Sequence, residues 1–183
     1  AVSTQVTVAL DAMGGDNAPS EPVLGALAAA GPDLRVILVG DEARLTAELD
    51  AAGGDASAIE ILHAADYIGS DEEGARAVRS KPDSSVAVAC RTVREGRAQA
   101  VMSAGHTGAM MAASILHLRR IRGVLRPGIA VVLPSARGRV VLIDAGANAE
   151  ARPEHLAQFA HMGRVFARDI LGVAEPSVGL LSI

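Results

Sequence analysis

Short runs of β-branched apolar residues alternate along this chain with segments whose apolar residues have helical spacing. This alternation limits the possible folds more than any other feature of the sequence. The run at 5–10 (QVTVAL) ends at an aspartate and a glycine pair, and a helix is expected over 20–30. The run at 35–39 (RVILV) is followed in the same way by an expected helix over 41–52. Strand, loop and helix in this order are typical of a buried parallel sheet, so the pattern predicts an α/β protein.

The rest of the chain extends this organisation. Ser20 is expected to cap the first helix. Apolar runs at 129–133 and 140–144 flank 137–139 (RGR), which predicts a hairpin and therefore a mixed, mostly parallel sheet. No internal repeat or Pro/Ser-rich linker divides the sequence, so a single α/β domain over 1–183 is expected. The remaining expected elements are strands at 59–63, 98–103 and 177–183, and helices ending at Arg79, from 84–85 to Gly96, at 109–120 and at 154–171.

The composition indicates an aliphatic core. The chain has 36 alanines and 19 glycines but only two Phe, one Tyr and no Trp, which argues against a stacking surface for single-stranded nucleic acid. A net charge of −4 gives no basic field for a polyanion. The single cysteine, Cys90, is interpreted as a small core residue. No apolar run reaches the roughly 18 residues of a membrane span, so a cytoplasmic protein is expected.

Ligands of open parallel sheets bind where the strands end, and three loops of this kind carry polar residues. The first loop, DAMGGDNAP, contains Asp11, Gly14, Gly15, Asp16 and Asn17. Its glycine pair lets backbone amides approach a ligand closely. Two interpretations of the aspartates stay open: they bind a cation or polar substrate, or they satisfy loop amides and cap the next helix.

The second loop, SAGHTG, contains Ser103, Gly105, His106, Thr107 and Gly108. Small residues and two hydroxyls in front of a helix suit phosphate, because unpaired N–H groups and the helix dipole favour an anion. No Gly-Lys-Ser/Thr sequence follows, so the loop is not a nucleotide-binding P-loop. The alternative is a tight turn in which Thr107 caps the helix.

The third loop, 144–150, places Asp144 at the end of a strand and Asn148 where its amide can orient an oxygen atom. His155, at the start of the longest helix, is the most suggestive general base, and the alternative is an ordinary surface histidine. The histidines show no zinc-binding spacing, so no metal is expected.

Charged segments outside these loops offer further candidates. Lys81 is the only lysine beside 16 arginines, and it either binds phosphate or an oxyanion or is ordinary surface. The acidic run 71–73 is interpreted as a solvated helix start. Four arginines between 119 and 126 form a possible docking patch for an acidic partner, or a solvated helix end.

Together these segments resemble the PlsX-type phosphate acyltransferases of bacterial phospholipid synthesis. The resemblance implies transfer of a fatty acyl group from acyl carrier protein to inorganic phosphate, which gives an acyl phosphate without a cofactor. The matching stretches follow the family's order: ALDAMGGDNAP (9–19), LVGD (38–41), AVRSKPDSSV (77–86), SAGHTGAM (103–110) and LIDAGANAEARPEHLAQFAHMG (142–163).

The resemblance also implies an isocitrate/isopropylmalate dehydrogenase-like three-layer α/β/α fold, a homodimer and peripheral contact with the inner face of the membrane. The acyl phosphate would pass to an acyl-phosphate-using glycerol-3-phosphate acyltransferase. The chain is expected to be the N-terminal portion of such an enzyme, incomplete at its C-terminus. It departs from the family at His106, where Asn is usual, and at Asn17, where His is frequent.

Residue roles follow from loop position and from the resemblance. Phosphate binding is assigned to Ser103, Gly105, Thr107 and Gly108, and catalysis to Lys81, His106, Asn148 and His155. The expected substrate-binding residues are Asp11, Gly14, Gly15, Asp16, Asn17 and Asp144. Two other functions stay open: a coenzyme A-dependent phosphate acetyl- or butyryltransferase-like enzyme, and a non-catalytic half-domain that binds acyl carrier protein.

Overall fold

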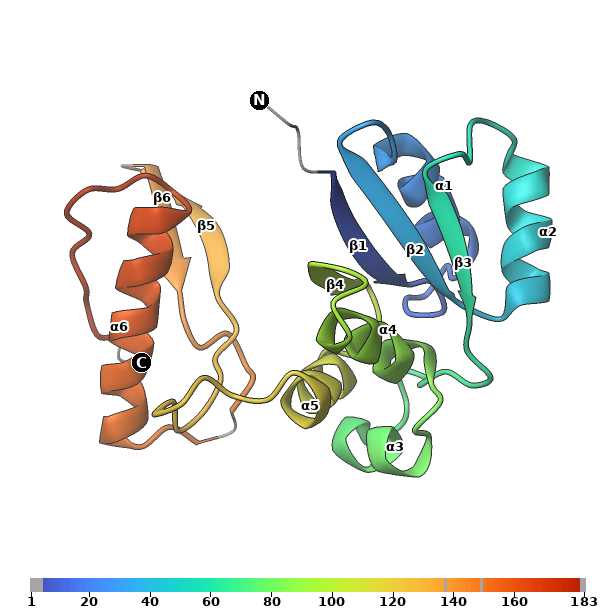
Figure 1. Ribbon diagram of the computed structural model, residues 1–183. Helices are drawn as coiled ribbons and strands as arrows, with labels where there is room; N and C mark the ends of the chain where they lie inside the picture. The colour runs from blue at the N-terminus through green and yellow to red at the C-terminus, as the bar shows by residue number, and fades with distance from the viewer. Residues whose placement is uncertain (1–4, 137, 149, 182–183) are drawn as a thin grey trace. The chain divides into compact units, whose positions relative to one another are not determined.

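The computed structural model describes residues 5–136, 138–148 and 150–181. The chain divides into two compact units, residues 1–119 and 120–183. The colour bar of Figure 1 marks residue 120, where the second unit begins. A single α/β domain is the prediction from the sequence. Each unit has a sheet of its own and is described by itself.

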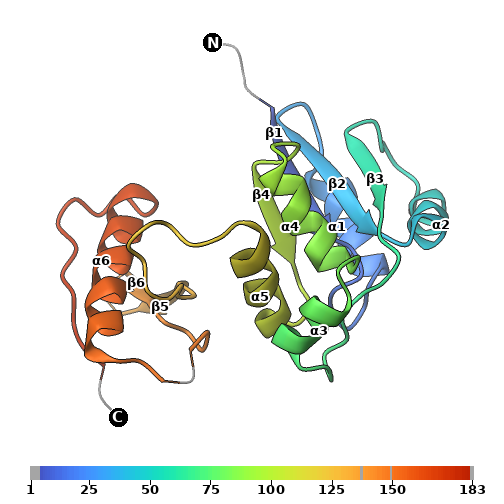
Figure 2. The ribbon, with the colours of Figure 1, turned by 60° about the horizontal axis from the view of Figure 1, so that its bottom comes forward.

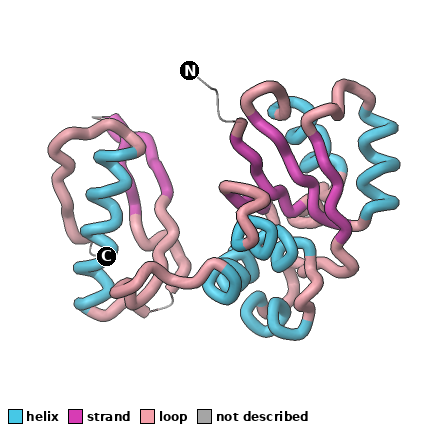
Figure 3. Tube along the Cα trace, in the orientation of Figure 1, coloured by secondary structure: helices cyan, strands magenta, loops and turns pink. Residues whose placement is uncertain are grey.

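The first unit is built on a four-stranded parallel sheet with the strand order β3-β2-β1-β4, drawn in magenta in Figure 3. Because the four strands run the same way, the loops that follow β1 and β4 leave the sheet at the same edge. The predicted α/β class and these four strands are confirmed. The strands are β1 (Val6–Asp11), β2 (Leu34–Gly40), β3 (Ile59–His63) and β4 (Ala100–Ser103).

Helices cover both faces of this sheet (Figure 2). The helices α1 (Ser20–Ala29) and α2 (Glu42–Ala52) pack on one face, and α4 (Ser85–Arg94) packs on the other. The side chains of β2 alternate accordingly: Val36 and Leu38 are buried with α1 and α2, and Ile37 and Val39 lie in the cluster under α4. Burial on both faces explains why this strand is an unbroken apolar run.

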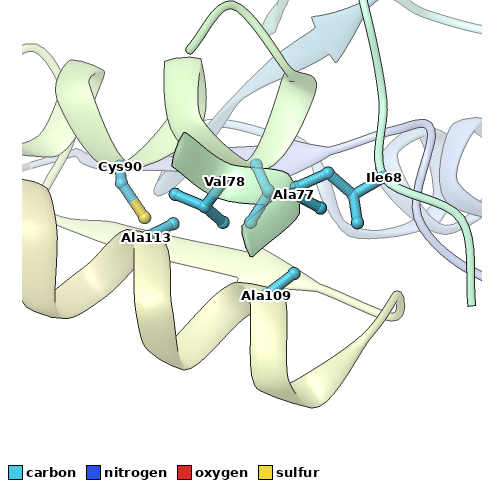
Figure 4. Packing of buried hydrophobic residues seen from close by; sticks show 7 residues of the cluster. Ile68, Ala77, Val78, Cys90, Ala109 and Ala113 are labelled. Atoms are coloured by element: carbon cyan, nitrogen blue, oxygen red, sulfur yellow. The ribbon is translucent and has the colours of Figure 1, made fainter. Parts of the chain in front are cut away.

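A cluster of small side chains joins α4 to α3 (Gly74–Ser80) and α5 (Thr107–His117). Figure 4 shows Val78, Cys90, Ala109 and Ala113 packed together in this cluster. Cys90 is fully buried, which confirms its interpretation as a core residue. The alanines of α5 allow the three helices to approach one another closely, and this places the start of α5 beside α3.

The second unit consists of a hairpin and a long helix. The strands β5 (Val131–Ser135) and β6 (Gly138–Leu142) pair antiparallel, and α6 (Pro153–Asp169) packs on β6 around the buried Phe159. The predicted hairpin and helix are confirmed, although residue 137 lies outside the described residues. Within the described ranges the hairpin forms its own two-stranded sheet instead of joining a mixed one. Two strands joined by a tight turn pair with each other without a crossover connection.

Two local predictions are wrong. Pro19 occupies the N-cap position of α1, and Ser20 lies inside the helix, where its Oγ donates a hydrogen bond to Glu48 Oε2 at 2.8 Å. No strand forms over 177–181, and 182–183 of that predicted strand lie outside the described residues. The segment 177–181 is mostly exposed and has no sheet partner in the described part of the chain. An apolar sequence without a partner does not form a strand.

Candidate functional site

The last residues of β1 and β4 face each other in the sheet. Asp11 pairs in register with Ser103, and Ser103 Oγ donates a hydrogen bond to Asp11 Oδ2 at 2.7 Å. The second carboxylate oxygen of Asp11 accepts from the Met13 amide at 3.3 Å, and the residue is only 4% exposed. Asp11 therefore ties the first and second loops together, which favours the interpretation that it satisfies loop groups.

The two loops approach so closely that glycine is required in both. A Cβ on Gly14 would lie 2.7 Å from Asp11 Oδ2 and 2.9 Å from the Gly105 amide nitrogen. A Cβ on Gly105 would lie 2.9 Å from Gly14 Cα, and the Gly105 amide donates to Ser103 Oγ at 3.1 Å. Gly15 follows with a φ of +111°, a conformation that side chains rarely adopt. The glycines thus build a tight junction of two backbones.

His106 caps the helix that follows the second loop. Its Nδ1 accepts hydrogen bonds from the amides of Gly108 at 3.0 Å and Ala109 at 3.3 Å. The expectation that Thr107 is the cap is wrong, because Thr107 is the first helical residue. A ring nitrogen that accepts carries no proton, so the neutral ring has its proton on Nε2. Thr107 is exposed, and neither its amide nor its hydroxyl has a hydrogen-bond partner within the described ranges.

Lys81, which follows α3, is surrounded by oxygen atoms. Its Nζ donates to Glu72 Oε1 at 2.9 Å and to the Tyr67 carbonyl at 3.0 Å, and it lies 3.6 Å from Asp66 Oδ1. The hydrogen bond to Glu72 raises the pKa of Lys81. The Gly69 amide, at 2.8 Å, and the Lys81 ammonium lower the pKa of Glu72. Lys81 is therefore a paired ammonium held in place.

Glu72 connects this ion pair to the start of α5. The Gly69 amide and the Lys81 ammonium hold the Glu72 carboxylate on the segment that leads into α3. Two residues on, a Cβ on Gly74 would lie 2.5 Å from the Ala109 amide nitrogen, and α3 and α5 lie side by side in Figures 1 and 2. From the sequence, Glu72 is expected to be a solvated residue at a helix start, because no periodic pattern reveals its bonds to Gly69 and Lys81.

Asp144 and Asn148 shape the third loop, in the second unit. The Asp144 carboxylate accepts from the amides of Ile129 (2.8 Å), Ala147 (3.2 Å) and Asn148 (2.8 Å) and from Asn148 Nδ2 (2.9 Å). Asn148 Nδ2 also donates to the Pro127 carbonyl at 2.8 Å. Burial raises the pKa of Asp144, but the donated hydrogen bonds together outweigh burial and lower it. Both side chains therefore act on the backbone of their own unit.

His155 is buried and does not form ordinary surface. It is 9% exposed, its Nδ1 accepts from the Arg152 amide at 3.3 Å, and its ring centroid lies 6.5 Å from that of Phe159. It thus closes the first turn of α6. Asp16 and Asn17 differ: both are exposed, and their side chains have no hydrogen-bond partner in the described part of the chain.

The predicted site residues form one group in each unit. The first unit brings Asp11, Gly14, Ser103 and Gly105 together next to His106, and the second holds the group of Asp144 and Asn148. Among the described residues, no three or more His, Cys, Asp or Glu side chains are grouped so that they could hold a metal ion. Nor does any helix of that part have the length and apolar character to cross a membrane.

Phosphotransacetylases are among the solved structures with this fold. The EutD phosphotransacetylase from Staphylococcus aureus matches with a TM-score of 0.64 and 19% identity, over 90% of this chain and 53% of that one. A phosphotransacetylase from Streptococcus pyogenes matches with a TM-score of 0.69 and 14% identity, over 92% of this chain and 55% of that one. At these identities the likeness defines the class of fold, an α/β fold with a mostly parallel sheet.

The chain belongs to the family described as fatty acid synthesis protein, which matches residues 6–183. It is 51% identical over 178 residues to the phosphate acyltransferase of Heliobacterium modesticaldum, covering 96% of this chain and 53% of the relative. It is 51% identical over 176 residues to the phosphate acyltransferase of Thermus thermophilus, covering 96% of this chain and 52% of the relative. The resemblance to PlsX-type phosphate acyltransferases is confirmed. The chain spans about half the length of these curated relatives.

Proposed function

We propose that this chain acts in the transfer of a fatty acyl group from acyl-[acyl carrier protein] to inorganic phosphate. The observation that carries the proposal is the open first turn of α5 beside the joined glycine loops, in a chain 51% identical to a phosphate acyltransferase. The product is an acyl phosphate, an activated anhydride. An acyl-phosphate-using glycerol-3-phosphate acyltransferase is the proposed consumer of it in phospholipid synthesis.

Phosphate is itself the nucleophile in this reaction. One phosphate oxygen attacks the thioester carbonyl carbon, the carbon–sulfur bond breaks, and the carrier protein leaves as a thiolate that takes up a proton. The step needs neither a covalent enzyme intermediate nor a redox cofactor. The protein has to hold both reactants in attack geometry and stabilise the tetrahedral oxyanion.

The proposed phosphate subsite lies at the N-terminus of α5. Thr107 offers its amide and hydroxyl, and the helix dipole favours an anion there. His106 can donate through Nε2 because Nδ1 is engaged with the helix amides, which include that of Gly108. Ser103 and Gly105 are proposed to shape the subsite without bonding to phosphate. The Ser103 hydroxyl donates to Asp11, and the Gly105 amide donates to Ser103.

The first and third loops hold the other proposed substrate residues, each in its own unit. Gly14 and Gly15 fix the first loop, whose exposed Asp16 and Asn17 are proposed substrate contacts. In the second unit, Asp144 fixes the third loop. Asn148 is proposed to orient the substrate through its carbonyl oxygen, since its Nδ2 is engaged. His155 is the proposed general acid and base, through Nε2, because Nδ1 accepts a backbone amide.

Family membership also supports a proposed assembly. We propose the isocitrate/isopropylmalate dehydrogenase-like three-layer α/β/α fold, of which the helix-covered sheet of residues 1–119 is consistent with one part. From the family resemblance we also propose that the chain is the N-terminal portion of such an enzyme. We further propose that the enzyme is a cytoplasmic homodimer in peripheral contact with the inner face of the membrane.

Release of free thiol from palmitoyl-acyl carrier protein tests the function. The 183-residue chain is measured beside a form extended to the length of its relatives, with phosphate varied. We expect phosphate-dependent release by the extended form. Thr107→Ala is expected to raise the KM for phosphate about tenfold, since it removes one hydrogen bond to a charged ligand. Thr46→Ala on α2 is the control. Folded protein that releases no thiol in either form overturns the proposal.

An arginine patch is the proposed docking surface for the acidic carrier protein. Its four residues are exposed: Arg119, Arg120, Arg122 and Arg126. Reversing the charge of Arg119 and Arg122 to Glu is expected to raise the KM for acyl-acyl carrier protein and to leave that for phosphate unchanged. Arg44→Glu, on α2, is the matched control. Unchanged affinity for the carrier protein rejects the patch.

A coenzyme A-dependent phosphate acetyl- or butyryltransferase-like enzyme is the second candidate, favoured by the fold shared with phosphotransacetylases. Consumption of acetyl- or butyryl-coenzyme A in preference to acyl-acyl carrier protein selects it. A non-catalytic half-domain is the third candidate, favoured by the share of the relatives that the chain spans. Such a domain binds acyl-acyl carrier protein and leaves its thioester intact.

A further inference from the structure

Carboxylates lie close to the place where an anion is proposed to bind. Asp11 is buried beneath the second loop, and its charge is bonded to Ser103 and to the Met13 amide. Glu72, with 30% of its side chain exposed, lies two residues before Gly74, which packs against Gly108 and Ala109 of α5. A partly exposed carboxylate repels a phosphate dianion unless a cation neutralises it. The state of Glu72 therefore bears on anion binding.

Lys81 is the cation that pairs with Glu72. An ammonium has three N–H donors, and three oxygen atoms surround this one: Glu72 Oε1, the Tyr67 carbonyl and Asp66 Oδ1. Glu72 and Tyr67 accept hydrogen bonds and Asp66 lies at an ion-pair distance of 3.6 Å, so phosphate would have to compete with three oxygen neighbours for this ammonium. The Gly69 amide bonds to the same Glu72 oxygen, which fixes the carboxylate from a second side.

The segment that carries Glu72 packs against the first turn of α5. Gly74, two residues after Glu72, lies so close to α5 that an added Cβ would be 2.7 Å from the Gly108 carbonyl carbon. His106 caps the same turn, where its Nδ1 accepts from the Gly108 amide at 3.0 Å. The ion pair and the cap thus belong to one packed unit.

We infer that Lys81 acts on the phosphate subsite through Glu72 and not by contact with phosphate: the ion pair neutralises and fixes a carboxylate on the segment packed against the first turn of α5. Lys81 and Glu72 are then positioning residues of the proposed site, and the inference rests on the proposed function because it assumes an anion at α5. Without Lys81, an unpaired carboxylate repels the anion. Without both residues, the repulsion is gone.

A double-mutant cycle tests this inference. Phosphate is titrated into the ¹⁵N-labelled 183-residue chain, and its Kd is taken from shifts of the amides of residues 104–108. Lys81→Met is expected to weaken binding about tenfold. Adding Glu72→Gln is expected to return the Kd to within about twofold of wild type. A double variant as weak as Lys81→Met means direct contact between Lys81 and phosphate and overturns the inference.

The control is Glu73→Gln in the Lys81→Met background, since Glu73 has the same charge but no ion pair with Lys81 among the described residues. We expect no recovery there, and equal recovery would overturn the inference. If Lys81→Met does not fold, the Glu72→Gln/Lys81→Met double variant decides alone, because wild-type affinity supports the inference and a tenfold loss rejects it.

The inference and the proposed function fail separately. If the amides of 104–108 in the wild-type chain do not respond to phosphate, the inference is overturned, while thiol release by the extended form still upholds the function. If Lys81→Met weakens phosphate binding and Glu72→Gln restores it, but no form releases thiol, the inference holds and the function is rejected.

Discussion

Gly14 determines how closely two loops approach, although it contributes no side chain. The loops after β1 and β4 come from positions 92 residues apart, and the hydrogen bond from Ser103 to Asp11 holds them together. Gly14 lies within this junction, where an added Cβ would meet the Asp11 carboxylate, the Ser103 hydroxyl and the Gly105 amide at 2.7 to 2.9 Å. Two of these three groups are held by the same hydrogen bond, so the site cannot relax around a larger residue without losing it.

Gly14→Ala is expected to lower the free energy of unfolding by about 1–3 kcal/mol, because the methyl group forces the junction apart. Gly25 in α1 is the matched control, since nothing lies within 4 Å of a Cβ there. Gly25→Ala is expected to raise the free energy of unfolding by about 0.5–1 kcal/mol. Urea unfolding of both variants checks this, and destabilisation of similar size at the two positions would contradict it.

Asp144 links the stability of the second unit to pH. Its pKa is lowered in the folded protein, because donated hydrogen bonds outweigh the effect of burial. A lowered folded-state pKa stabilises the fold above the unfolded pKa, and this stability is lost as the pH falls through the folded pKa. Asp144→Asn is expected to lower the free energy of unfolding by about 1 kcal/mol at neutral pH, and by less in acid.

Urea unfolding at a series of pH values measures this difference. Asp169→Asn is the control in the same unit, since Asp169 is an exposed partner of Arg168 and its replacement is expected to have little effect. A difference between wild type and Asp144→Asn that does not change with pH would disprove the link.

The start of α5 is capped by histidine. Thr is a common capping residue, and the sequence leaves a Thr107 cap open as the alternative, but the helix begins at Thr107 and His106 takes the cap position. The imidazole Nδ1 accepts the two amides that a side-chain oxygen usually satisfies. This explains how a histidine stands where the PlsX-type family usually has asparagine.

His106→Ala is expected to lower the free energy of unfolding by about 1 kcal/mol, because two helix amides lose their acceptor. His106→Asn should retain most of that energy, since its amide oxygen can accept in the same place. Thr107→Ala should change it by less than about 0.5 kcal/mol. Thermal or urea unfolding ranks the three variants, and a larger loss for Thr107→Ala than for His106→Ala would refute the assignment of the cap.

On the scale of the whole molecule, the division into two units falls within the arginine patch. The first unit ends at Arg119, which has a φ of +68°, and an irregular segment follows before β5. Gln158 on α6 bonds to Gly123 and Leu125, which anchors the later part of that segment to the second unit. The Arg119 amide still bonds to the Ser114 carbonyl of α5, but residues 120–122 have no hydrogen bond to a helix or strand within the described ranges, since the bonds from Arg120 to Leu125 and from Val124 to Ile121 stay inside the segment.

Limited trypsin digestion is therefore expected to cut first after Arg119, Arg120 or Arg122, because the protease needs an exposed and locally extended chain. Mass spectrometry of the first fragments identifies the site. Arg76 and Arg91 serve as internal controls, since they lie in α3 and α4. A first cut within either helix would contradict the division into units.

Much of the candidate site could be predicted from the sequence, and the rest could not for a definite reason. Glycine-containing loops after apolar runs identify Gly14, Ser103 and Thr107 from neighbouring residues alone. The partners of Lys81 and the burial of His155 are contacts that no periodicity encodes. Glu72 was missed because its carboxylate is held by Gly69, three residues back, and by Lys81, nine residues on.

The sequence by itself determined the α/β class, the strands and helices of the first unit and the family, because these depend on local patterns of apolar and glycine residues. Only the tertiary structure decided which groups act on one another across the chain, such as Asp11 on Ser103 and Lys81 on Glu72. The physical reason is that side-chain hydrogen bonds and ion pairs act over a few ångströms. Residues remote in sequence reach that distance only after the parallel strands and the helices packed on them have assembled.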